Sequence, residues 1–463
     1  MSNEKVFAII LLGDEKMMTT LQIIVNKALT FICKLFHRNG SQFPGAISYN
    51  MNQHVLEKIK YPKYVIGVTG SSGKGTTTQM IYHILTDAGL DVSYNASGSN
   101  GIRGITTLVL NSCTLTGKFK HDVLLLELDE RHLHLAFGKN KMTHLVVTNI
   151  TRDQPARNGS PDLIYDAIFN AIDEKTTLIL NADDPGLMKE KINFKGKIVT
   201  YGINKTKDSY SKKENFSVDN AYCPKCHKKL VYYYYHYGHI GSYYCQNCDF
   251  KRGTPDYTAT KVDLKNKTML INNNEVCLNK NFLFTAYATL AAYALTDTIG
   301  IKEKQILYAL NDDMIESKRG LEYKIDNRNV LMLESKNENA LSYYQSLRYI
   351  INEEGQKSVI LGFDNVSRRY KFNDLSWLWD VDFELLNDDS IEKIFLIGRF
   401  KWDVLVRLKY AKIKAKKIVL IDDLNDLIDT VKKESTGDIY TMVCFDMTEI
   451  IKKKIKEYNN GNN

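Results

Sequence analysis

The chain has 463 residues, of which 44% are hydrophobic and 25% charged, and its formal net charge is +8. These values are ordinary for globular proteins and leave room for two to four domains of about 100–200 residues each. No stretch approaches the roughly 20 consecutive apolar residues that cross a bilayer, which excludes a transmembrane helix. The lysines are scattered and form no basic arm for nucleic acid, but the charge suits anionic partners such as nucleotides or phospholipid headgroups.

The N-terminal region contains two apolar segments. "VFAIILL" (6–12) is too short for a signal peptide and is followed at once by "GDEK". In "LQIIVNKALTFICKLF" (21–36) the apolar residues recur at helical spacing, interrupted by Lys27 and Lys34. This pattern predicts an amphipathic helix packed on a domain, with a membrane-surface role as the alternative. We expect a cytoplasmic protein, with visits to the inner face of the membrane as an open alternative.

The middle of the chain alternates short β-branched runs with helical stretches. The runs "YVIGVTG" (64–70), "DVLLLEL" (122–128), "HLVVTN" (144–149) and "TLILN" (177–181) predict a parallel sheet flanked by helices. A long apolar-faced helix is expected over 281–301.

A second, smaller doubly wound α/β domain is expected in the last third of the chain. Its predicted strands lie at 357–363, 393–398, 417–422 and 438–445. The domain boundaries that we predict are an N-terminal helical segment at 1–60, a central α/β domain at 61–324 with an insert at about 220–256, a C-terminal domain at 325–455 and a disordered tail at 456–463.

The stretch "GVTGSSGKGTTTQM" (67–80) joins a predicted strand to a predicted helix. Small residues there allow backbone N–H groups to converge on phosphate oxygens, and the helix adds the positive end of its dipole. Lys74 would neutralise the β- and γ-phosphates, while Thr76, or else Thr77, would hold Mg²⁺. The alternative is a glycine-serine turn that merely caps a helix. The predicted nucleotide-binding residues are Gly70, Ser71, Ser72, Gly73, Lys74, Gly75, Thr76 and Thr77.

Four of the eight cysteines form the pattern C-x2-C-x18-C-x2-C: Cys223, Cys226, Cys245 and Cys248. This spacing predicts a structural zinc ribbon with four thiolate ligands, and the tyrosine-rich stretch between the pairs predicts a β-hairpin. Disulfides or a redox pair are the alternatives, and His227, His236 and His239 are spare ligands. The isolated cysteines, expected as small core residues, are Cys33, Cys113, Cys277 and Cys444.

The phosphate-loop spelling "GSSGKGTTT" resembles that of the Mur ligase superfamily, which makes amide bonds at the expense of ATP. The resemblance implies that Glu127, at the end of "LLLELDE" (124–130), binds Mg²⁺ together with Thr76. It also implies that Asn181 and Asp183 of "LNADDP" (180–185) lie near the nucleotide. "TNITRDQPARNGS" (148–160) is similar to a further superfamily segment, in which Gln154 replaces a histidine.

Within that superfamily the chain resembles the MurT family. The resemblance is carried by the cysteine pattern and by several motifs: "FPGAI" (43–47), "NASGSNGIRGITT" (95–107), "RDQ" (152–154), "RGLE" (319–322), "SKNENAL" (335–341) and "GRFKWDVLVRLKYA" (398–411). It implies an ATP-dependent synthetase subunit that works with a GatD-like glutaminase partner on lipid II, a membrane-bound substrate. Ammonia from the partner would amidate the α-carboxyl of D-glutamate through an acyl phosphate and give D-isoglutamine, with Lys74 and Mg²⁺ supplying charge neutralisation.

One further motif bears on the partner. "NDLSWLWDVDFE" (373–384) is similar to a MurT segment whose aspartate completes the catalytic triad of the glutaminase. The resemblance assigns this role to Asp374, with Asp380 second. On the residues alone, Trp377 and Trp379 are core anchors and both aspartates are turn residues.

Two other functions stay open at this point. The Gly75 spelling also fits a ligase that adds an amino acid, such as a relative of folylpolyglutamate synthase. Gln154, Gly75 and the divergent "KNENA" (336–340) would fit a non-catalytic nucleotide-binding scaffold.

Overall fold

The structure is a computed structural model that describes residues 3–96, 99–134, 141–211, 219–311, 321–335, 337–367 and 372–461. The chain forms two compact units, which are described separately. The first contains residues 1–150, 162–206 and 251–315, and the second contains residues 151–161, 207–250 and 316–463. The four-cysteine segment, expected as an insert of the central domain, therefore groups with the C-terminal α/β region.

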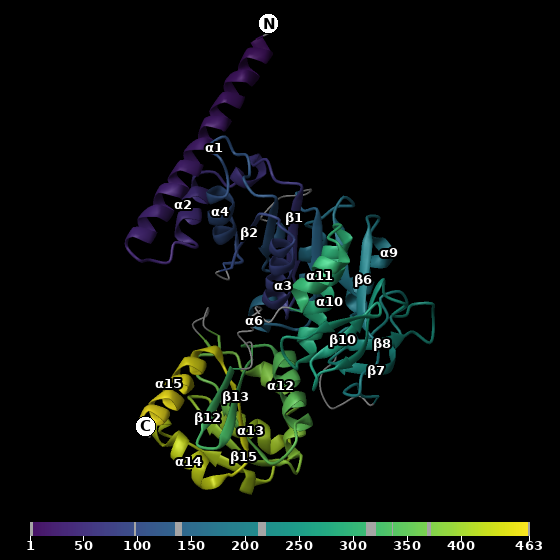
Figure 1. Cartoon of the computed structure of the whole chain (residues 1–463), viewed down its shortest axis with the longest axis vertical. Coiled ribbons are helices and arrows are strands. Elements are labelled where there is room, and N and C mark those ends of the chain that lie inside the picture. The colour runs from purple at the N-terminus through teal and green to yellow at the C-terminus, as the bar shows by residue number, and fades with distance from the viewer. Residues whose placement is uncertain are drawn as a thin grey trace. The chain divides into compact units, whose positions relative to one another are not determined.

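The first unit is built on a mostly parallel sheet. Within the described residues, its strand order is β11-β10-β9-β6-β5-β4-β1-β3-β2. Figure 1 labels β1, β2, β6 and β10 among these strands. Pairings among β1 to β6 and between β6 and β9 are parallel, whereas β9, β10 and β11 form an antiparallel meander. The strands are β1 (Tyr64–Thr69), β2 (Val92–Tyr94), β3 (Val123–Glu127), β4 (His144–Val147), β5 (Thr177–Asn181), β6 (Ile198–Ile203), β9 (Tyr257–Asp263), β10 (Thr268–Ile271) and β11 (Asn274–Cys277).

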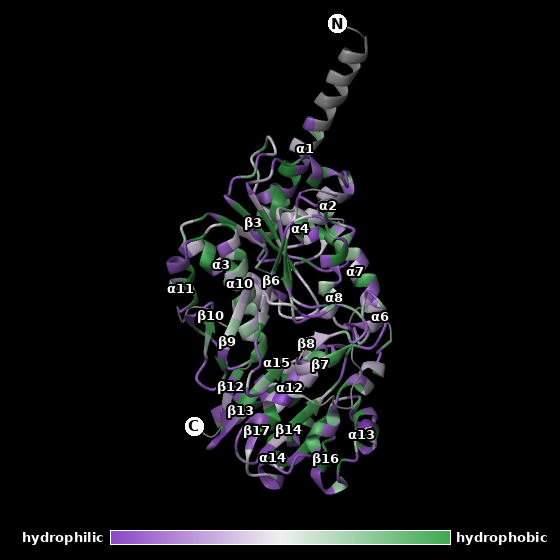
Figure 2. Cartoon of the chain, turned by 90° about the vertical axis from the view of Figure 1, so that its right-hand side faces the viewer, coloured by the Kyte–Doolittle hydropathy of each residue, from purple (hydrophilic) through white to green (hydrophobic). Residues whose placement is uncertain are grey.

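The four strands predicted for the middle of the chain are confirmed as β1, β3, β4 and β5, with slightly shorter bounds. Val65, Ile66 and Val68 of β1 are at most 1% exposed, as expected for a strand covered on both faces. Figure 2 shows hydrophobic colouring on strands of this sheet such as β3. In this parallel arrangement the carboxyl ends of β1, β3 and β4 lie at one edge of the sheet.

Helices pack on this sheet. The apolar-faced helix predicted for 281–301 is confirmed as α10, which contacts β4, β5, β6 and β9 as well as α3 and α11. The helices of the unit are α1 (Asn3–Leu35), α2 (Phe43–Met51), α3 (Lys74–Asp87), α4 (Ile102–Asn111), α7 (Pro161–Phe169), α8 (Pro185–Met188), α9 (Glu190–Asn193), α10 (Leu283–Thr298) and α11 (Glu303–Leu310), with the 3-10 turn η1 (Val55–Lys58).

Helix α1 confirms the predicted amphipathic helix packed on a domain, and the side that packs carries both polar residues and the fully buried Ile23. The helix contacts α2 and α4, which lie beside it in Figure 1. Gln22 and Asn26 face inward and are fully buried, whereas Phe31 and Leu35 are 68% and 64% exposed. The polar side chains turn inward because their amide groups find hydrogen-bonding partners on α2 and α4. Across the described residues, no helix combines the length and hydropathy needed to cross a membrane.

The second unit contains the predicted C-terminal sheet. Its order within the described residues is β12-β13-β17-β14-β15-β16, parallel except for the β12-β13 hairpin. The four predicted strands are confirmed as β14, β15, β16 and β17. A separate antiparallel hairpin, β7-β8, confirms the hairpin predicted between the cysteine pairs. The strands are β7 (Val231–Tyr237), β8 (Ile240–Tyr244), β12 (Leu321–Ile325), β13 (Arg328–Glu334), β14 (Lys357–Gly362), β15 (Ile391–Ile397), β16 (Ile418–Leu420) and β17 (Asp438–Val443).

The last helix of this unit corrects the predicted disordered tail. Helix α15 continues to Gly461, because Ile451 and Ile455 enter the core and Asn459 Nδ2 donates to Lys324 O at 3.0 Å. Residues 462 and 463 lie outside the described residues. The helices of the unit are α6 (Pro155–Asn158), α12 (Ala340–Asn352), α13 (Lys401–Tyr410), α14 (Leu427–Glu434) and α15 (Phe445–Gly461), with 3-10 turns η2 (Ser376–Asp380), η3 (Phe383–Asn387), η4 (Ala415–Lys417) and η5 (Leu424–Asp426).

Candidate active site and cysteine cluster

The loop between β1 and α3 has the backbone that a phosphate cradle requires. Gly70 and Gly73 have φ of 130° and 81°, in the region that favours glycine, and α3 begins at Lys74. A Cβ on Gly70 would lie 2.2 Å from Thr148 Oγ1, so a side chain is excluded there by contact as well as by conformation. A Cβ on Gly73 would meet nothing within 4 Å. The two glycines are thus required for different reasons.

The loop is held in place by the residues that follow β4. Ser71 N donates to Asn149 O at 2.8 Å, and Thr148 Oγ1 donates to Ser72 O at 2.6 Å. The Ser72 hydroxyl also donates to Asn149 Oδ1 at 3.0 Å. Sequence reasoning gave Thr148 and Asn149 no role. Their position directly after β4, a strand adjacent to β1 in a parallel sheet, could have indicated that they contact the loop.

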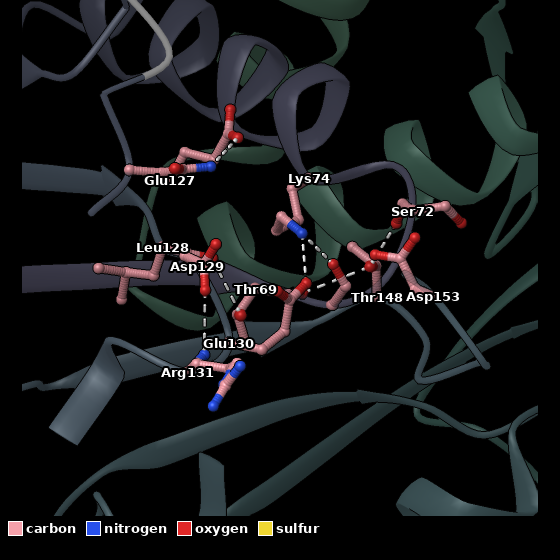
Figure 3. A network of polar contacts seen from close by, with 12 residues as sticks. Thr69, Ser72, Lys74, Glu127, Leu128, Asp129, Glu130, Arg131, Thr148 and Asp153 are labelled. Atoms are coloured by element: carbon pink, nitrogen blue, oxygen red, sulfur yellow. Dashed lines mark hydrogen bonds and ion pairs between the residues drawn. The ribbon is translucent and has the colours of Figure 1, made fainter. Parts of the chain in front are cut away.

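Lys74 is only 9% exposed and its Nζ makes two close contacts (Figure 3). It donates to Gly70 O and forms an ion pair with Glu130, which is 4% exposed. Glu130 lies three residues after Glu127 and was not predicted as a site residue. A buried carboxylate therefore faces the lysine that was predicted to bind phosphate.

Glu127 lies at the end of β3, opposite Val68 of β1, as predicted. Its Oε1 accepts a hydrogen bond from Asn100 Nδ2 at 3.2 Å. A Cβ on Gly75 would lie 3.3 Å from Glu127 Oε2, so this carboxylate reaches the first turn of α3 beside a glycine. A hard oxygen ligand in this position suits Mg²⁺.

The two candidate hydroxyls on α3 differ in exposure. Thr76 is partly exposed, whereas Thr77 is fully buried and its Oγ1 has no hydrogen-bond partner among the described residues. Of the two, Thr76 has solvent access, as a residue that holds a hydrated metal ion needs. The assignment of Thr76 to Mg²⁺ stays a prediction.

Asn181 and Asp183, predicted near the nucleotide, are fully buried. Asn181 Nδ2 donates to Thr148 O at 3.1 Å, which connects it to the residue that holds the loop. Asp183 accepts hydrogen bonds from Tyr287 Oη at 2.6 Å and from Ile203 N at 2.8 Å. It also pairs with Arg252. These bonds give both residues a structural role, and their contact with a nucleotide stays a prediction.

The structure brings the four predicted cysteines together in the second unit. Their sulfur atoms all lie within 4.8 Å of one another, with Cys223–Cys248 at 3.5 Å and Cys226–Cys245 at 3.4 Å. Four thiolates 2.3 Å from a tetrahedral zinc ion would lie about 3.8 Å apart, which these distances fit. All four are free cysteines, so the disulfide alternative is wrong.

The other histidines and cysteines lie elsewhere. His236 Nδ1 hydrogen bonds with Ser209 Oγ at 3.0 Å and His239 Nε2 with Asn220 Nδ2 at 3.3 Å, so neither joins the sulfur cluster. Among the isolated cysteines, Cys113 and Cys444 are buried as predicted and Cys33 is partly buried. The prediction is wrong for Cys277, which is exposed because it points to the opposite face of β11 from the buried Val276.

The two aspartates proposed for the partner's triad differ in their surroundings. Asp374 is partly exposed, and its Oδ1 accepts the Ser376 N–H at 2.9 Å. Asp380 Oδ2 instead pairs with Arg152 Nη1 at 3.1 Å. The predicted core anchoring is correct for Trp377, which is 2% exposed, and wrong for Trp379, which is 51% exposed.

Asp374 belongs to a group of acidic side chains in the second unit. Burial raises the pKa of the Glu338 carboxyl, and the nearby charges of Asp374 and Asp153 raise it further, against the Ser367 hydrogen bond, which lowers it. Ser367 Oγ donates to Glu338 Oε1 at 2.6 Å, and its Oγ also accepts the Asp374 N–H at 3.0 Å. Lys336 of the "SKNENAL" motif and residues 319–320 of the "RGLE" motif lie outside the described residues.

A hollow of about 420 Å³, which includes space open to solvent, lies in the same unit beside the Arg152–Asp380 pair. Arg152 N donates to Asp219 Oδ2 at 2.7 Å on its wall. The remaining lining residues are Thr151, Gly238, His239, Ala340, Leu341 and Tyr344.

Comparison with known proteins matches both parts of the chain. The Mur ligase middle domain model matches residues 68–248, and the MurT ligase C-terminal model matches residues 336–447. The MurT subunit of the glutamine-hydrolysing lipid II isoglutaminyl synthase from Staphylococcus aureus (strain N315) is 29% identical over 82% of this chain and 85% of that protein. Its counterpart from Streptococcus pneumoniae (strain ATCC BAA-255 / R6) is 27% identical over 92% of this chain and 94% of that protein.

Among solved structures, the pseudomurein peptide ligase type C from Methanothermus fervidus superposes with a TM-score of 0.65 at 22% identity. The superposition covers 87% of this chain and 80% of that protein. The likeness supports the fold. The α/β architecture, the phosphate loop and the family matches together define the class of the chain, a Mur-type ATP-dependent ligase.

Within that class, the C-terminal model and the two relatives all carry the name MurT. The C-terminal model and the two relatives aligned over most of their length agree on one family. Over most of its length the chain matches that family, MurT.

Proposed function

We propose that this chain is the synthetase subunit of a glutamine-hydrolysing lipid II isoglutaminyl synthase. It uses ATP to amidate the α-carboxyl of D-glutamate in the lipid II stem peptide, and the product is D-isoglutamine. The observation that carries this proposal is the joint presence, in one chain, of the Lys74 phosphate loop and the MurT C-terminal region. Both relatives that support it carry this activity in their names.

The chemistry proceeds in two balanced steps. The substrate carboxylate oxygen attacks the γ-phosphorus of ATP, the bond to the bridging oxygen breaks, and ADP leaves with an acyl phosphate formed. Ammonia then attacks the acyl carbon, inorganic phosphate leaves, and the nitrogen loses a proton to give the amide. Lys74, the loop N–H groups and the N-terminus of α3 favour the first step, because they stabilise negative charge on the transferred phosphoryl group.

Two metals fit the residues present. Glu127, next to the first turn of α3, and Thr76 would hold Mg²⁺, which neutralises phosphate charge when bound. Cys223, Cys226, Cys245 and Cys248 would hold a structural zinc ion, because four thiolates leave no open coordination position.

Ammonia comes from a separate glutaminase subunit of the GatD type. Asp374 would complete that subunit's catalytic triad, because a partly exposed carboxylate can orient a histidine and stabilise its charged form. Asp380 is the weaker candidate, since Arg152 already neutralises it.

The decisive experiment purifies the chain with its glutaminase partner and supplies ATP, glutamine and lipid II. Phosphate release and conversion of one stem-peptide carboxyl to a carboxamide, followed by mass spectrometry, should depend on all four components. Free ammonium should replace glutamine and the partner. Incorporation of an added amino acid in place of ammonia would instead indicate an amino-acid ligase, and nucleotide binding without turnover would indicate a scaffold.

A further inference from the structure

The packed side of helix α1 carries Ile23 and two buried amide side chains, Gln22 and Asn26. Gln22 Nε2 donates to Ser48 O at 2.6 Å and to Asn52 O at 3.0 Å at the α2 end. Asn26 Nδ2 donates to Thr107 O at 3.1 Å and to Asn111 Oδ1 at 2.9 Å on α4. Gln22 and Asn26 are both fully buried. These hydrogen bonds fix the rotation of the helix about its axis.

The outward side of the same helix is apolar. Met17 and Phe31 are each 68% exposed and Phe36 is 69% exposed, although such side chains are normally buried. The spacing of the exposed residues follows three- and four-residue steps, so they lie on one continuous stripe of the helix. The members of this stripe, together with Phe36 directly after the helix and exposed apolar residues of the adjacent α2, are Met17, Met18, Leu21, Ile24, Phe31, Ile32, Leu35, Phe36, Phe43, Ile47 and Met51.

Within residues 16–56 the charges beside the stripe have one sign. From Lys16 to Leu56 the sequence contains no aspartate or glutamate. Lys16 and Lys34 are exposed, and at 100° per residue they lie on the same side of the helix, next to the apolar stripe. Arg38 follows just after the helix and is also exposed. Between residues 16 and 56, the charged side chains beside the apolar surface are therefore all cationic.

This charge pattern distinguishes between the possible occupants of the surface. In a coiled coil with a second copy, charges beside the seam normally alternate in sign and pair between helices. Here a second copy would bring lysines together without an acidic partner. An anionic phospholipid surface provides both apolar chains for the stripe and negative headgroups for the lysines.

We propose that α1 is an interfacial helix that lies in the plane of an anionic phospholipid surface, with Leu21, Ile24, Phe31 and Leu35 inserted at the headgroup level. The fixed rotation of α1 then holds the first unit at the membrane surface. The proposal concerns lipid binding and does not depend on the proposed amidation reaction.

The test measures binding of the full chain to vesicles. Flotation with vesicles of phosphatidylcholine and phosphatidylglycerol should recover the protein at low salt, and pure phosphatidylcholine vesicles should recover much less. The variant Leu21→Glu/Phe31→Glu should lower the partition coefficient about tenfold or more, because it places two charges in the apolar contact. The matched control is Leu163→Glu/Tyr308→Glu, which makes the same charge change at exposed apolar residues elsewhere in the first unit.

The possible results distinguish between a lipid surface and a second copy of the chain as the partner of the apolar stripe. Vesicle binding that is lost in the α1 variant and retained in the control supports the proposal, provided that circular dichroism shows both variants folded. Absence of wild-type binding to anionic vesicles, or equal binding by both variants, overturns it. A wild-type dimer in light scattering that the α1 variant dissociates, without vesicle binding, assigns the surface to a second copy and also overturns it. None of these measurements includes ATP or lipid II, so failure here leaves the proposed function intact.

Discussion

The Lys74 ammonium and the Glu130 carboxylate form an ion pair that is almost completely buried beside the loop after β1. Glu130 thus offers Lys74 the negative charge that a nucleotide phosphate would also offer. Because the two charges are shielded from water, removing one of them is costly, whereas removing both is much less so. This relationship separates the role of Lys74 in stability from its role in phosphate binding.

Lys74→Ala should destabilise the chain by about 3 kcal/mol, because it leaves the buried Glu130 carboxylate facing no lysine. The double variant Lys74→Ala/Glu130→Gln should recover most of that stability, measured by urea unfolding. Neither variant should form acyl phosphate in the amidation assay. Undiminished amidation by Lys74→Ala would remove the loop from the mechanism.

Alanine at the two loop glycines should have unequal effects. Gly73→Ala introduces only backbone strain, about 1 kcal/mol, because no atom lies within 4 Å of the new Cβ. Gly70→Ala should cost more and weaken ATP binding, because its Cβ would collide with Thr148 Oγ1 and displace the loop. Urea unfolding and titration with a fluorescent ATP analogue measure both effects. Equal losses in the two variants would contradict the contact that we describe between Gly70 and Thr148.

Asp374→Asn should abolish glutamine hydrolysis by the complex while leaving ammonium-driven amidation intact. Asparagine keeps the hydrogen bond to the Ser376 N–H, so the stability of the chain should change by less than about 1 kcal/mol. Asp380→Asn is the matched control and should retain glutaminase activity, since Asp380 pairs with Arg152. If glutaminase activity instead survives in Asp374→Asn and is lost in Asp380→Asn, the two assignments must be exchanged.

Metal analysis should find one zinc ion per chain. Cys223→Ser should lose the zinc and lower the thermal midpoint, because the ribbon then lacks one of its four ligands. Cys277→Ser, at an exposed cysteine on β11, should keep the metal and the midpoint. A chain that contains iron at full stoichiometry, or a metal-free chain that is equally stable, would contradict the zinc assignment.

Much of the fold follows from local patterns. Sequence patterns predicted the strands β1, β3, β4 and β5 and helix α10. A buried parallel strand has a short run of β-branched residues, and a buried helix has a longer apolar run. The antiparallel strands β9, β10 and β11 were not predicted. They lie at the edge of the sheet, where partial exposure makes the apolar pattern weaker.

The candidate site was predictable where a motif depends on residues close in sequence. The loop from Gly70 to Lys74 and the cysteine pairs are such motifs, because their residue spacing by itself predicts phosphate binding and metal binding. Glu130 and Thr148 were missed because their contacts with the loop arise only when β3 and β4 lie on either side of β1.

Length, periodicity and motif spacing by themselves determined the α/β class, the phosphate loop and the cysteine cluster, because these depend on short-range geometry. Only the tertiary structure decided which buried carboxylate meets Lys74 and which side of α1 faces outward. Those outcomes depend on partners distant in the chain: Glu130 for the lysine, and the carbonyl groups of Ser48 and Thr107 for the helix. A hydropathy pattern turns apolar residues inward by default, whereas in α1 the hydrogen-bonded amides of Gln22 and Asn26 face inward beside Ile23 and most of the large apolar side chains face outward.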